Sequence, residues 1–396
     1  MTVAETNRLN DKTAIAGIGA TEFSKDSGRT ELQLACEAVR NALDDCGLSP
    51  SDVDGMVTFT MDNNPEIEVA RTVGIGALSY FSRVPHGGGA CCGTIHQAAM
   101  AVATGAAEVV VAYRAFNERS GRRYGTGVQD RSVEPTTENA QYQWYTPFGL
   151  LTPASWVAMY AQRYMYEYGA TTEDFGRVAV VDRKHAATNP NAFFYEKPIT
   201  LEEHAASRWI VEPLRLLDCC QESDGGQALI VTSAERARDL KQKPAIVKAV
   251  GQGAEADQES MTSFYRPEIA CLPEMELVGR QLWNSSGLTP ADIQTAVIYD
   301  AFSFFVMVAI EAHGFCGPGE AKDFIRDGNI EMGGGLPVNT HGGQLGEAYI
   351  HGMNGIAEAV RQVRGTAVNQ VPNVEHVLAT AGTGVPTSSV VVGIDR

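Results

Sequence analysis

The sequence predicts a layered α/β fold built from a duplicated unit, on the strength of three observations. Strand-like and helix-like segments alternate toward both ends of the chain, as is typical of layered α/β folds. Two stretches 240 residues apart repeat one pattern, which indicates an internal duplication. The 396 residues exceed the roughly 250 to 300 at which a single core usually stops growing, so we expect two packed units.

The first part of the chain alternates between strand and helix signals. Gly17 and Gly19 fit a tight turn rather than a dinucleotide fingerprint, because Glu22 stands where the third glycine of that fingerprint would be. The pattern predicts a strand over 12–20, an amphipathic helix over 30–48, a strand over 53–60, and a Gly-rich turn, helix and strand within 87–113.

From Arg114 to about Trp209 the strand signal fades and aromatic residues accumulate. The segment is too aromatic to be disordered, so it predicts a long helical insertion. Next to a catalytic turn, such an insertion could form the wall that selects a bulky apolar substrate. Strand character returns with "SDGGQALIVTS" at 223–233.

The repeated pattern links the two parts of the chain. "CGLSPSDVDGMVTFT", from Cys46, and "SGLTPADIQTAVIYD", from Ser286, both read as a helix end, a proline-started turn and a buried strand. The second unit begins near 243–254 and closes with a helix over 354–365 and a strand and turn over 376–394.

Composition excludes several classes of partner. The 31 Lys and Arg against 48 Asp and Glu give a net charge of −17, whereas nucleic acids and anionic membranes require a basic face. The start of the chain lacks a charged and apolar leader, and no apolar run reaches the ~18 residues of a membrane span, so we expect a cytoplasmic protein. The 8 cysteines show no metal-ligand spacing, so we expect reduced thiols and no metal site.

Cys91 and Cys92 stand between a Gly-rich turn and an Ala-rich helical run. The position raises the question of whether either thiol is a nucleophile. Across essentially the whole chain, five motifs together resemble the thiolase superfamily, and within it the branch of lipid-transfer proteins and sterol-carrier-protein X. They are "GGGACCGT" (87–94), "SDGGQALIVTS" (223–233), "VIYDAF" (297–302), "NTHGGQLGEAYIHGMNG" (339–355) and "TAGTG" (380–384).

The resemblance implies the architecture and the substrate class. It implies two pseudo-duplicated βαβαβαββ halves, each with a five-stranded sheet, stacked as a five-layer αβαβα structure with a helical loop-domain insertion. It also implies a coenzyme A thioester as substrate. The expected boundaries are 1–120 with 206–240 for the first half, 121–205 for the insertion and 241–396 for the second half.

Three acid/base positions of the thiolases are changed in this chain. Tyr349 stands where thiolases have the histidine of a Gly-His-Pro motif, and the closing loop around Gly382 has no cysteine. Tyr299, followed by Asp300, stands where sterol-carrier-type thiolases have a His-Asp pair. With a pKa of about 10, a tyrosine is a poor base but a good acid toward an enolate. We therefore expect enolate chemistry in which Cys91 does not attack the substrate.

If Cys91 is not a nucleophile, the Gly-rich turn must have another function. Its N–H groups, at the start of a helix, could hold the thioester oxygen as negative charge develops. The residues expected in this oxyanion and CoA-binding role are Cys91, Cys92, Gly382 and Gly343. Arginines of the "FNERSGRR" run, Arg119, Arg122 and Arg123, could meet CoA phosphates or lie in a solvated loop.

The steroid side-chain-cleaving aldolases of bacterial steroid degradation resemble this chain most closely, since they carry both tyrosines. The resemblance implies retro-aldol cleavage of a steroid β-hydroxyacyl-CoA, such as 17-hydroxy-3-oxopregn-4-ene-20-carboxyl-CoA, to a 17-ketosteroid and propionyl-CoA. We favour Tyr349 as base and Tyr299 as acid, and the reverse assignment stays open. Asp300 could orient Tyr299 or cap a helix, and His351 could assist proton transfer or be structural.

Two other functions are compatible with these residues. A degradative thiolase would use Cys91 or Cys92, with a base not identified in the sequence. A non-catalytic acyl-CoA or sterol-binding protein would explain the lost thiolase residues but not the two tyrosines. The resemblance further implies a homodimer with the "EVVVAY" strand (108–113) at its interface. It also implies a small OB-fold partner with a zinc ribbon, forming a heterotetramer, and no cofactor in this chain beyond the CoA of its substrate.

Overall fold

The computed structural model describes residues 9–85, 87–121, 123, 142–259, 261–382, 384 and 386–395. Its first half alternates strands and helices as expected. The elements are β1 (Thr13–Ala20), α1 (Glu31–Cys46), β2 (Gly55–Phe59), α2 (Glu66–Val73), β3 (Tyr80–Val84), α3 (Cys91–Ala103), β4 (Val109–Asn117) and, after the insertion, β7 (Asp224–Ser233). A short helix, α8 (Ala234–Arg238), leads to the second half.

The second half repeats this order. Its elements are β8 (Ala245–Gly253), α9 (Pro273–Ser286), β9 (Thr295–Ile298), α10 (Ser303–Ala312), α11 (Ala321–Arg326), α12 (Gly343–Gly346), α13 (Met353–Arg364), β10 (His376–Gly382) and β11 (Thr387–Gly393). The duplication extends to the helix ends, because Gly47 closes α1 and Gly287 closes α9, each in the left-handed conformation. The duplicated unit predicted from the sequence is therefore confirmed.

Strand order is the same in the two halves. The strands run β3-β2-β4-β7-β1 in the first half and continue as β8-β11-β10-β9 in the second, where a single parallel bridge from Ala296 to Val338 replaces the fifth strand. The first strands of the halves, β1 and β8, pair antiparallel at Ala14 with Ile246 and at Ile15 with Ala245. The expected two five-stranded sheets are thus joined at a short seam into one nine-stranded sheet.

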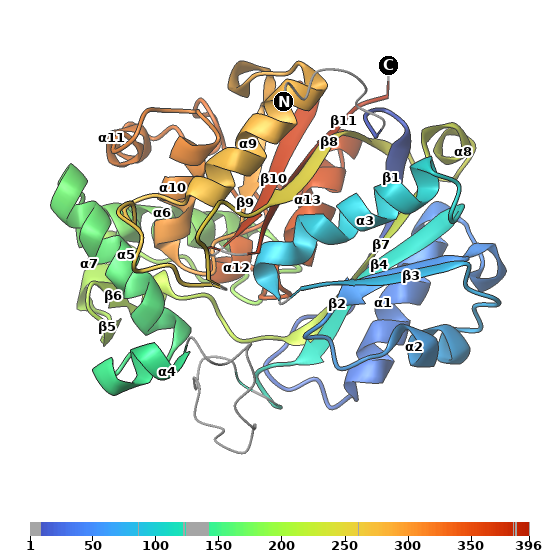
Figure 1. Ribbon diagram of the computed structural model, residues 1–396, viewed down its shortest axis with the longest axis horizontal. Coiled ribbons are helices and arrows are strands. Elements are labelled where there is room, and N and C mark those ends of the chain that lie inside the picture. The colour runs from blue at the N-terminus through green and yellow to red at the C-terminus, as the bar shows by residue number, and fades with distance from the viewer. Residues whose placement is uncertain are drawn as a thin grey trace.

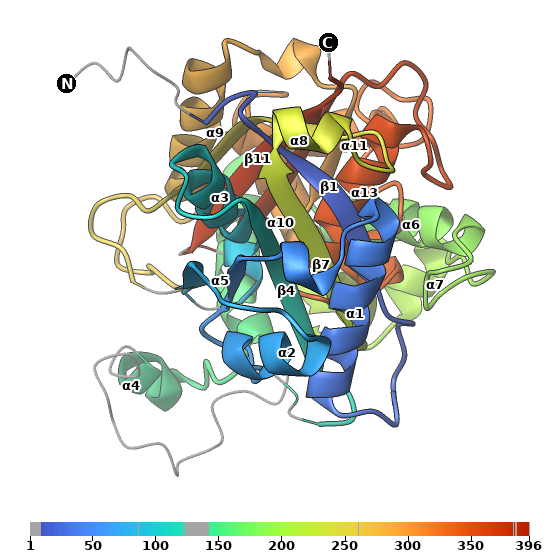
Figure 2. The ribbon, with the colours of Figure 1, turned by 90° about the vertical axis from the view of Figure 1, so that its right-hand side faces the viewer.

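Helices form the outer and middle layers of the fold. On one side, α1 packs against β1, β4 and β7, and on the other α9 packs against β8 and β11 (Figures 1 and 2). Between them, α3 and α13 each contact strands of both halves. The fit of α1 is close, because a Cβ on Gly19 would lie 2.1 Å from the backbone nitrogen of Ala42. The apolar stripe of α1, which includes Leu34, is buried. Burying one large apolar side chain stabilises the fold by roughly 1.5 to 3 kcal/mol.

Between β4 and β7 the chain makes a mainly helical insertion, drawn in green beside α10 and α11 in Figure 1. Its elements are α4 (Tyr142–Tyr145), α5 (Pro153–Tyr168), α6 (Thr172–Thr188), α7 (Leu201–Ala206) and a hairpin of β5 (Trp209–Val211) and β6 (Leu214–Arg215). Helix α6 packs against α10, α11 and α12 of the second half. Residues 124–141, part of the expected insertion, lie outside the described residues.

Two expectations about β4 need correction. The strand continues to Asn117, beyond its expected end at Tyr113, so Arg114 belongs to the sheet and lies within the expected first half. The expected interface strand at 108–113 lies inside the sheet, between β2 and β7, and its backbone is already paired on both sides. The terminal strand of this half is β3, where Phe81 is 58% exposed. None of the described helices is both long and apolar enough to cross a membrane.

Candidate active site

The two tyrosines predicted from the sequence meet in the structure. Tyr299 follows the end of β9, and Tyr349 lies in the segment between α12 and α13. Their hydroxyl oxygens are 2.9 Å apart in a hydrogen bond, and their ring centroids are 6.2 Å apart. Because each hydroxyl has one proton and two lone pairs, a proton can pass along this bond in either direction.

Burial disfavours the phenolate form of both tyrosines. Tyr299 is 3% exposed and Tyr349 is partly buried. Burial raises the pKa of Tyr299 well above its usual value, and the neighbouring Cys220 thiol adds to this. Burial likewise raises the pKa of Tyr349, and Tyr299 adds to it. At neutral pH the pair therefore holds two protons and is suited to donating one.

The Gly-rich turn of the first half lies directly against this pair. Residues 88–90 form a single turn of 3-10 helix, and α3 begins at Cys91. A Cβ on Gly88 would lie 1.8 Å from the Tyr299 hydroxyl oxygen, so only glycine fits there. A Cβ on Gly352, just before α13, would lie 2.8 Å from the Cys91 sulfur. The starts of the two central helices thus meet at the tyrosine pair.

The closing hairpin of the second half completes this side of the site. Gly382 ends β10, where it pairs with Thr387 of β11. The Ser388 hydroxyl donates to the Gly89 carbonyl at 2.7 Å, and a Cβ on Gly89 would lie 1.9 Å from the Pro386 carbonyl oxygen. The hairpin with Gly382 is thereby held against the Gly-rich turn, as expected for a site to which both halves contribute.

The two cysteines of the turn are buried. Their sulfur atoms are 3.9 Å apart, and Cys92 contacts the Ala379 carbonyl oxygen at 3.5 Å. Burial raises the pKa of Cys92 well above its usual value, with Cys91 adding to the effect. Cys92 is therefore a packed thiol, since the reactive form of a cysteine is the thiolate.

His351 is fixed beneath Tyr349 by a buried ion pair. The Arg114 Nε–H donates to His351 Nδ1 at 3.0 Å, and Arg114 pairs with Asp62 at 2.9 Å. The His351 ring stacks on Phe116 and meets the edge of Tyr349, with centroids 5.0 Å apart in both cases. Burial and the Arg114 charge lower the pKa of His351 well below its usual value. We therefore interpret His351 as a neutral packing partner of Tyr349.

Asp300 and Gly343 lie together at the start of α12. The Asp300 carboxylate accepts from the Gln344 N–H at 2.7 Å and from the Leu345 N–H at 2.9 Å, which caps α12. A Cβ on Gly343 would lie 2.2 Å from Asp300 Oδ2. Gly343, expected among the oxyanion and CoA-binding positions, is thus needed for this close approach. Of the two roles expected for Asp300, the contacts show the helix cap, and its catalytic role stays a prediction.

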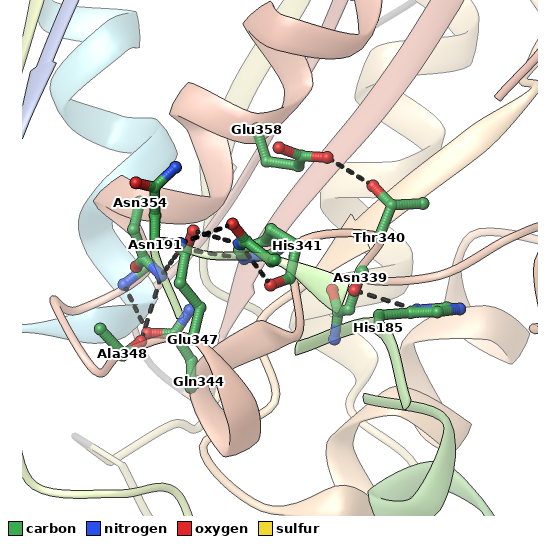
Figure 3. A network of polar contacts seen from close by, with 12 residues as sticks. His185, Asn191, Asn339, Thr340, His341, Gln344, Glu347, Ala348, Asn354 and Glu358 are labelled. Carbon is green, nitrogen blue, oxygen red and sulfur yellow. Dashed lines mark hydrogen bonds and ion pairs between the residues drawn. The ribbon is translucent and has the colours of Figure 1, made fainter. Parts of the chain in front are cut away.

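A buried polar network fixes the segment that carries Tyr349 (Figure 3). The Glu347 carboxylate accepts from the side-chain amides of Asn189 at 3.1 Å and Asn354 at 2.9 Å, and lies 3.9 Å from His341 Nε2. Asn189 follows the insertion helix α6, so the insertion helps to fix Glu347 and the segment that carries Tyr349. The expected wall for a bulky apolar substrate stays a prediction.

Three site residues were missed by the sequence reasoning. Asp62, Arg114 and Glu118 are buried; Arg114 lies in β4, and Glu118 lies in the turn that follows it. The apolar residues Ala115 and Phe116 after Arg114 were the available signal that the strand continues, but we ended it at Tyr113. Of the arginines suggested for CoA phosphates, Arg123 pairs with Glu222 at 2.7 Å. Arg122 lies outside the described residues.

The described residues contain no cluster of three or more His, Cys, Asp or Glu side chains that could hold a metal ion. The layers described above, with a Gly-rich turn before one central helix and a tyrosine segment before the other, define a thiolase-type fold. The chain belongs to the thiolase family, since the thiolase N-terminal domain matches residues 13–235 and the thiolase C-terminal domain-like family matches residues 254–394.

Particular relatives sharpen this assignment. A steroid side-chain-cleaving aldolase of Thermomonospora curvata is 69% identical, over 97% of this chain and 98% of the relative. A 17-hydroxy-3-oxo-4-pregnene-20-carboxyl-CoA lyase of Mycobacterium tuberculosis is 65% identical, over 97% of this chain and 100% of the relative. The solved Ltp2-ChsH2(DUF35) aldolase superposes with a TM-score of 0.95 at 67% identity, covering 98% of this chain and 100% of the solved one. The family resemblance inferred from the motifs is confirmed.

Proposed function

We propose that this protein is a carbon-carbon lyase that cleaves a steroid β-hydroxyacyl-CoA to a 17-ketosteroid and propionyl-CoA. The observation that carries the proposal is the bonded tyrosine pair, buried where the Gly-rich turn of the first half meets the second half. Relatives named for steroid side-chain cleavage, at 69% and 65% identity, support the steroid substrate. The substrate we expect is 17-hydroxy-3-oxopregn-4-ene-20-carboxyl-CoA.

The reaction needs one proton moved and one bond broken. Tyr349 accepts the hydroxyl proton as it passes its own proton to Tyr299 along their hydrogen bond. The bond between the α- and β-carbons breaks to release the ketone, and the electron pair forms an enolate on the thioester. N–H groups at the start of α3 stabilise the enolate oxygen, because the helix dipole is positive there. Tyr299, with Tyr349 bonded behind it, then protonates the α-carbon. Atoms balance without water or a second CoA.

Thiolase chemistry is the alternative with a specific candidate residue, Cys91. A thiolase-type attack needs a base that generates the thiolate, and a tyrosine with a raised pKa stands at the histidine position. Nδ1 of the nearby His351 already accepts from Arg114. These observations favour the lyase.

We also propose that the chain works as a homodimer with a partner of the DUF35 kind, a small OB-fold protein with a zinc ribbon, in a cytoplasmic heterotetramer. The likeness to the Ltp2-ChsH2(DUF35) aldolase supports this partner. The terminal strand β3, with exposed Phe81, is the better candidate for the dimer contact, because β4 is paired on both sides. In this proposal the chain itself uses no cofactor, and any zinc belongs to the partner.

The deciding experiment incubates the protein, alone and coexpressed with a DUF35 partner, with the steroid hydroxyacyl-CoA and without free CoA. Mass spectrometry should detect propionyl-CoA and the 17-ketosteroid in equal amounts. Products that form only from a β-ketoacyl-CoA with added CoA would establish a thiolase instead. Saturable binding with no product from either substrate would establish a binding protein.

A further inference from the structure

A pocket of about 450 Å³ lies between the insertion and the second half of the fold. Trp144 and Tyr145, at the end of α4, line it from the insertion. Glu259, Phe264 and Tyr265, in the segment between β8 and α9, line it from the second half. Small-molecule sites typically have volumes of about 300 to 1,000 Å³ and aromatic walls, so this pocket has the size and lining of such a site.

The aromatic walls of this pocket are held in place by contacts behind them. The Phe264 ring lies 5.3 Å from the ring of Tyr145 and 5.1 Å from that of Tyr160, a buried residue of α5. The Tyr160 hydroxyl accepts from the Ser263 N–H at 2.8 Å, and the Tyr145 hydroxyl donates to the Glu259 carboxylate. Walls that are ordered before a ligand enters lose little conformational entropy when it binds.

Two aromatic side chains of the pocket are largely exposed. Trp144 is 74% exposed and Tyr265 is 59% exposed. They belong to opposite walls, one supplied by the insertion and the other by the second half. Large aromatic side chains contribute much of the binding free energy when a ligand buries them. These two rings are therefore available to an apolar ligand in the pocket.

The pocket is connected to the reaction site through the closing hairpin. The segment that carries Phe264 and Tyr265 also contains Met261, whose carbonyl oxygen would lie 2.9 Å from a Cβ on Gly384. Gly384 follows Gly382 in the hairpin, which packs against the Gly-rich turn beside the tyrosine pair. One segment thus contacts the reaction site and forms a wall of the pocket. A substrate whose reacting carbons lie at the tyrosine pair can place its far end there.

Charge determines which end of the substrate suits this pocket. Residues 254–272 contain one basic side chain, Arg266, which is ion-paired to Glu274 at 2.9 Å. Among the acidic side chains of this stretch, Glu255 is paired with Arg280 at 3.2 Å. The other acidic residues leave the stretch negatively charged; they are Asp257, Glu259 and Glu268. Such a segment repels the phosphates of coenzyme A, whereas an uncharged ring system meets no repulsion.

We propose that this aromatic pocket binds the steroid ring system of the substrate, and that Trp144 and Tyr265 determine its specificity. The inference rests on the proposed function. The thioester and the β-hydroxyl lie at the tyrosine pair, and the fused rings extend between the insertion and the segment that follows β8. Contacts far from the reacting atoms contribute to cleavage because they hold the substrate in the geometry that the reaction needs.

The test compares two substrates that react alike and differ in their far end. One is the steroid hydroxyacyl-CoA, and the other is 2-(1-hydroxycyclopentyl)propanoyl-CoA, which keeps the tertiary alcohol and the thioester but lacks the remaining rings. Both are assayed in the presence of the DUF35 partner. Trp144→Ala and Tyr265→Ala should each lower kcat/KM for the steroid by about tenfold or more, and leave that for the cyclopentyl substrate within about twofold. Tyr166→Ala, at an 82% exposed position of α5 outside the pocket, is the matched control and should change neither value.

A binding measurement separates this inference from the proposed function. The 17-ketosteroid product carries no CoA, so calorimetry measures its Kd whether or not the protein cleaves a substrate. Both variants should raise this Kd by about tenfold. An unchanged Kd and an unchanged kcat/KM for the steroid would overturn the inference, as would an equal loss of kcat/KM with both substrates.

Two further outcomes are distinct. Loss of the DUF35 partner from the variants on size-exclusion chromatography, with the Kd of the ketosteroid unchanged, would overturn the inference and identify the pocket as a docking surface for that partner. A wild-type protein that binds the ketosteroid through Trp144 and Tyr265 but releases no propionyl-CoA would contradict the proposed function and leave the assignment of the pocket in place.

Discussion

The starts of the two central helices, α3 and α13, occupy equivalent places in the two halves but carry different chemistry. Before α3 the chain is reduced to glycines, so that backbone N–H groups are exposed to the site. Before α13 it carries Tyr349 and His351, both held by buried contacts. Duplication placed two helix starts face to face, and divergence then separated charge stabilisation from proton transfer.

This difference also explains how the acid/base groups are supported. The glycine turn needs only close packing against Tyr299 and the closing hairpin. The tyrosine segment needs Glu347 and the Asp300 cap, because its side chains must be oriented. A helix start that acts through its backbone is thus simple to maintain, whereas one that acts through side chains requires a surrounding polar network.

The largest effect is expected from removing the hydroxyl groups of the tyrosine pair, which transfer protons. Tyr299→Phe and Tyr349→Phe should each lower kcat by about 100-fold or more, since general acid catalysis is lost while the ring still packs. KM should change by less than about threefold. Propionyl-CoA release gives the rate, and Tyr195→Phe, at a partly exposed position, is the control. Full activity in both variants would remove the tyrosine pair from the mechanism.

The next largest effect is expected from a change at the contact between the Gly-rich turn and Tyr299. Gly88→Ala puts a Cβ 1.8 Å from the Tyr299 hydroxyl oxygen, so the tyrosine or the turn must move. We expect kcat to fall by about 100-fold at most and stability to fall by about 1 to 3 kcal/mol. Urea unfolding and turnover should be compared with Gly76→Ala, which meets open space. Equal behaviour of the two variants would contradict the close contact.

His341 and His351, on either side of α12, should make stability depend on pH. The pKa of His351 is lowered well below its usual value, and burial lowers that of His341 to about 4. Below about pH 6.5 the unfolded chain binds protons on these residues that the folded chain does not. The free energy of unfolding therefore decreases as the pH is lowered. Each contributes up to about 1.4 kcal/mol per pH unit.

Urea unfolding between about pH 7 and about pH 5 measures this slope. His351→Asn, which tolerates the positive φ of 49° at this position, should make the slope shallower by the share of one histidine. An unchanged slope would mean that His351 is protonated in the folded protein.

The smallest effect is expected at the Gly-rich turn before α3, whose backbone N–H groups stabilise negative charge. Cys91→Ala keeps the backbone N–H groups of the turn, so kcat should stay within about threefold of the wild type. Mass spectrometry of the protein quenched during turnover should find no acyl group on either cysteine. Loss of activity together with an acyl adduct on the wild-type protein would identify Cys91 as a nucleophile.

The sequence predicted much of the fold because duplication leaves a visible pattern. The helix ends at Gly47 and Gly287 and the strands after them recur at one spacing, and the structure reproduces both. The seam between β1 and β8 was not predictable, because two residue pairs leave no periodic signal. The end of β4 was missed because Arg114 looks like a surface residue until its partners are known.

The site residues whose type differs at a motif position were predicted from the sequence. The residues whose burial depends on distant contacts were missed. Tyr299 and Tyr349 stood out as replacements at matched motif positions. The burial of Glu118 was not foreseen, since a glutamate next to Arg119 in an arginine-rich run suggests a solvated loop. Its burial follows from contacts with distant segments, such as the Asp224 bonds to the next two residues, and local patterns do not contain them.

The seam has a consequence for the order of the chain. The first and last strands both lie at the start of β8: Ile15 and Gly393 pair with Ala245 and Ile246, and Asp11 is ion-paired to Lys248. A chain order in which β8 came first and β11 led through a linker into β1 would keep every strand neighbour. The neighbours of each strand in the sheet therefore do not depend on which half comes first in the chain.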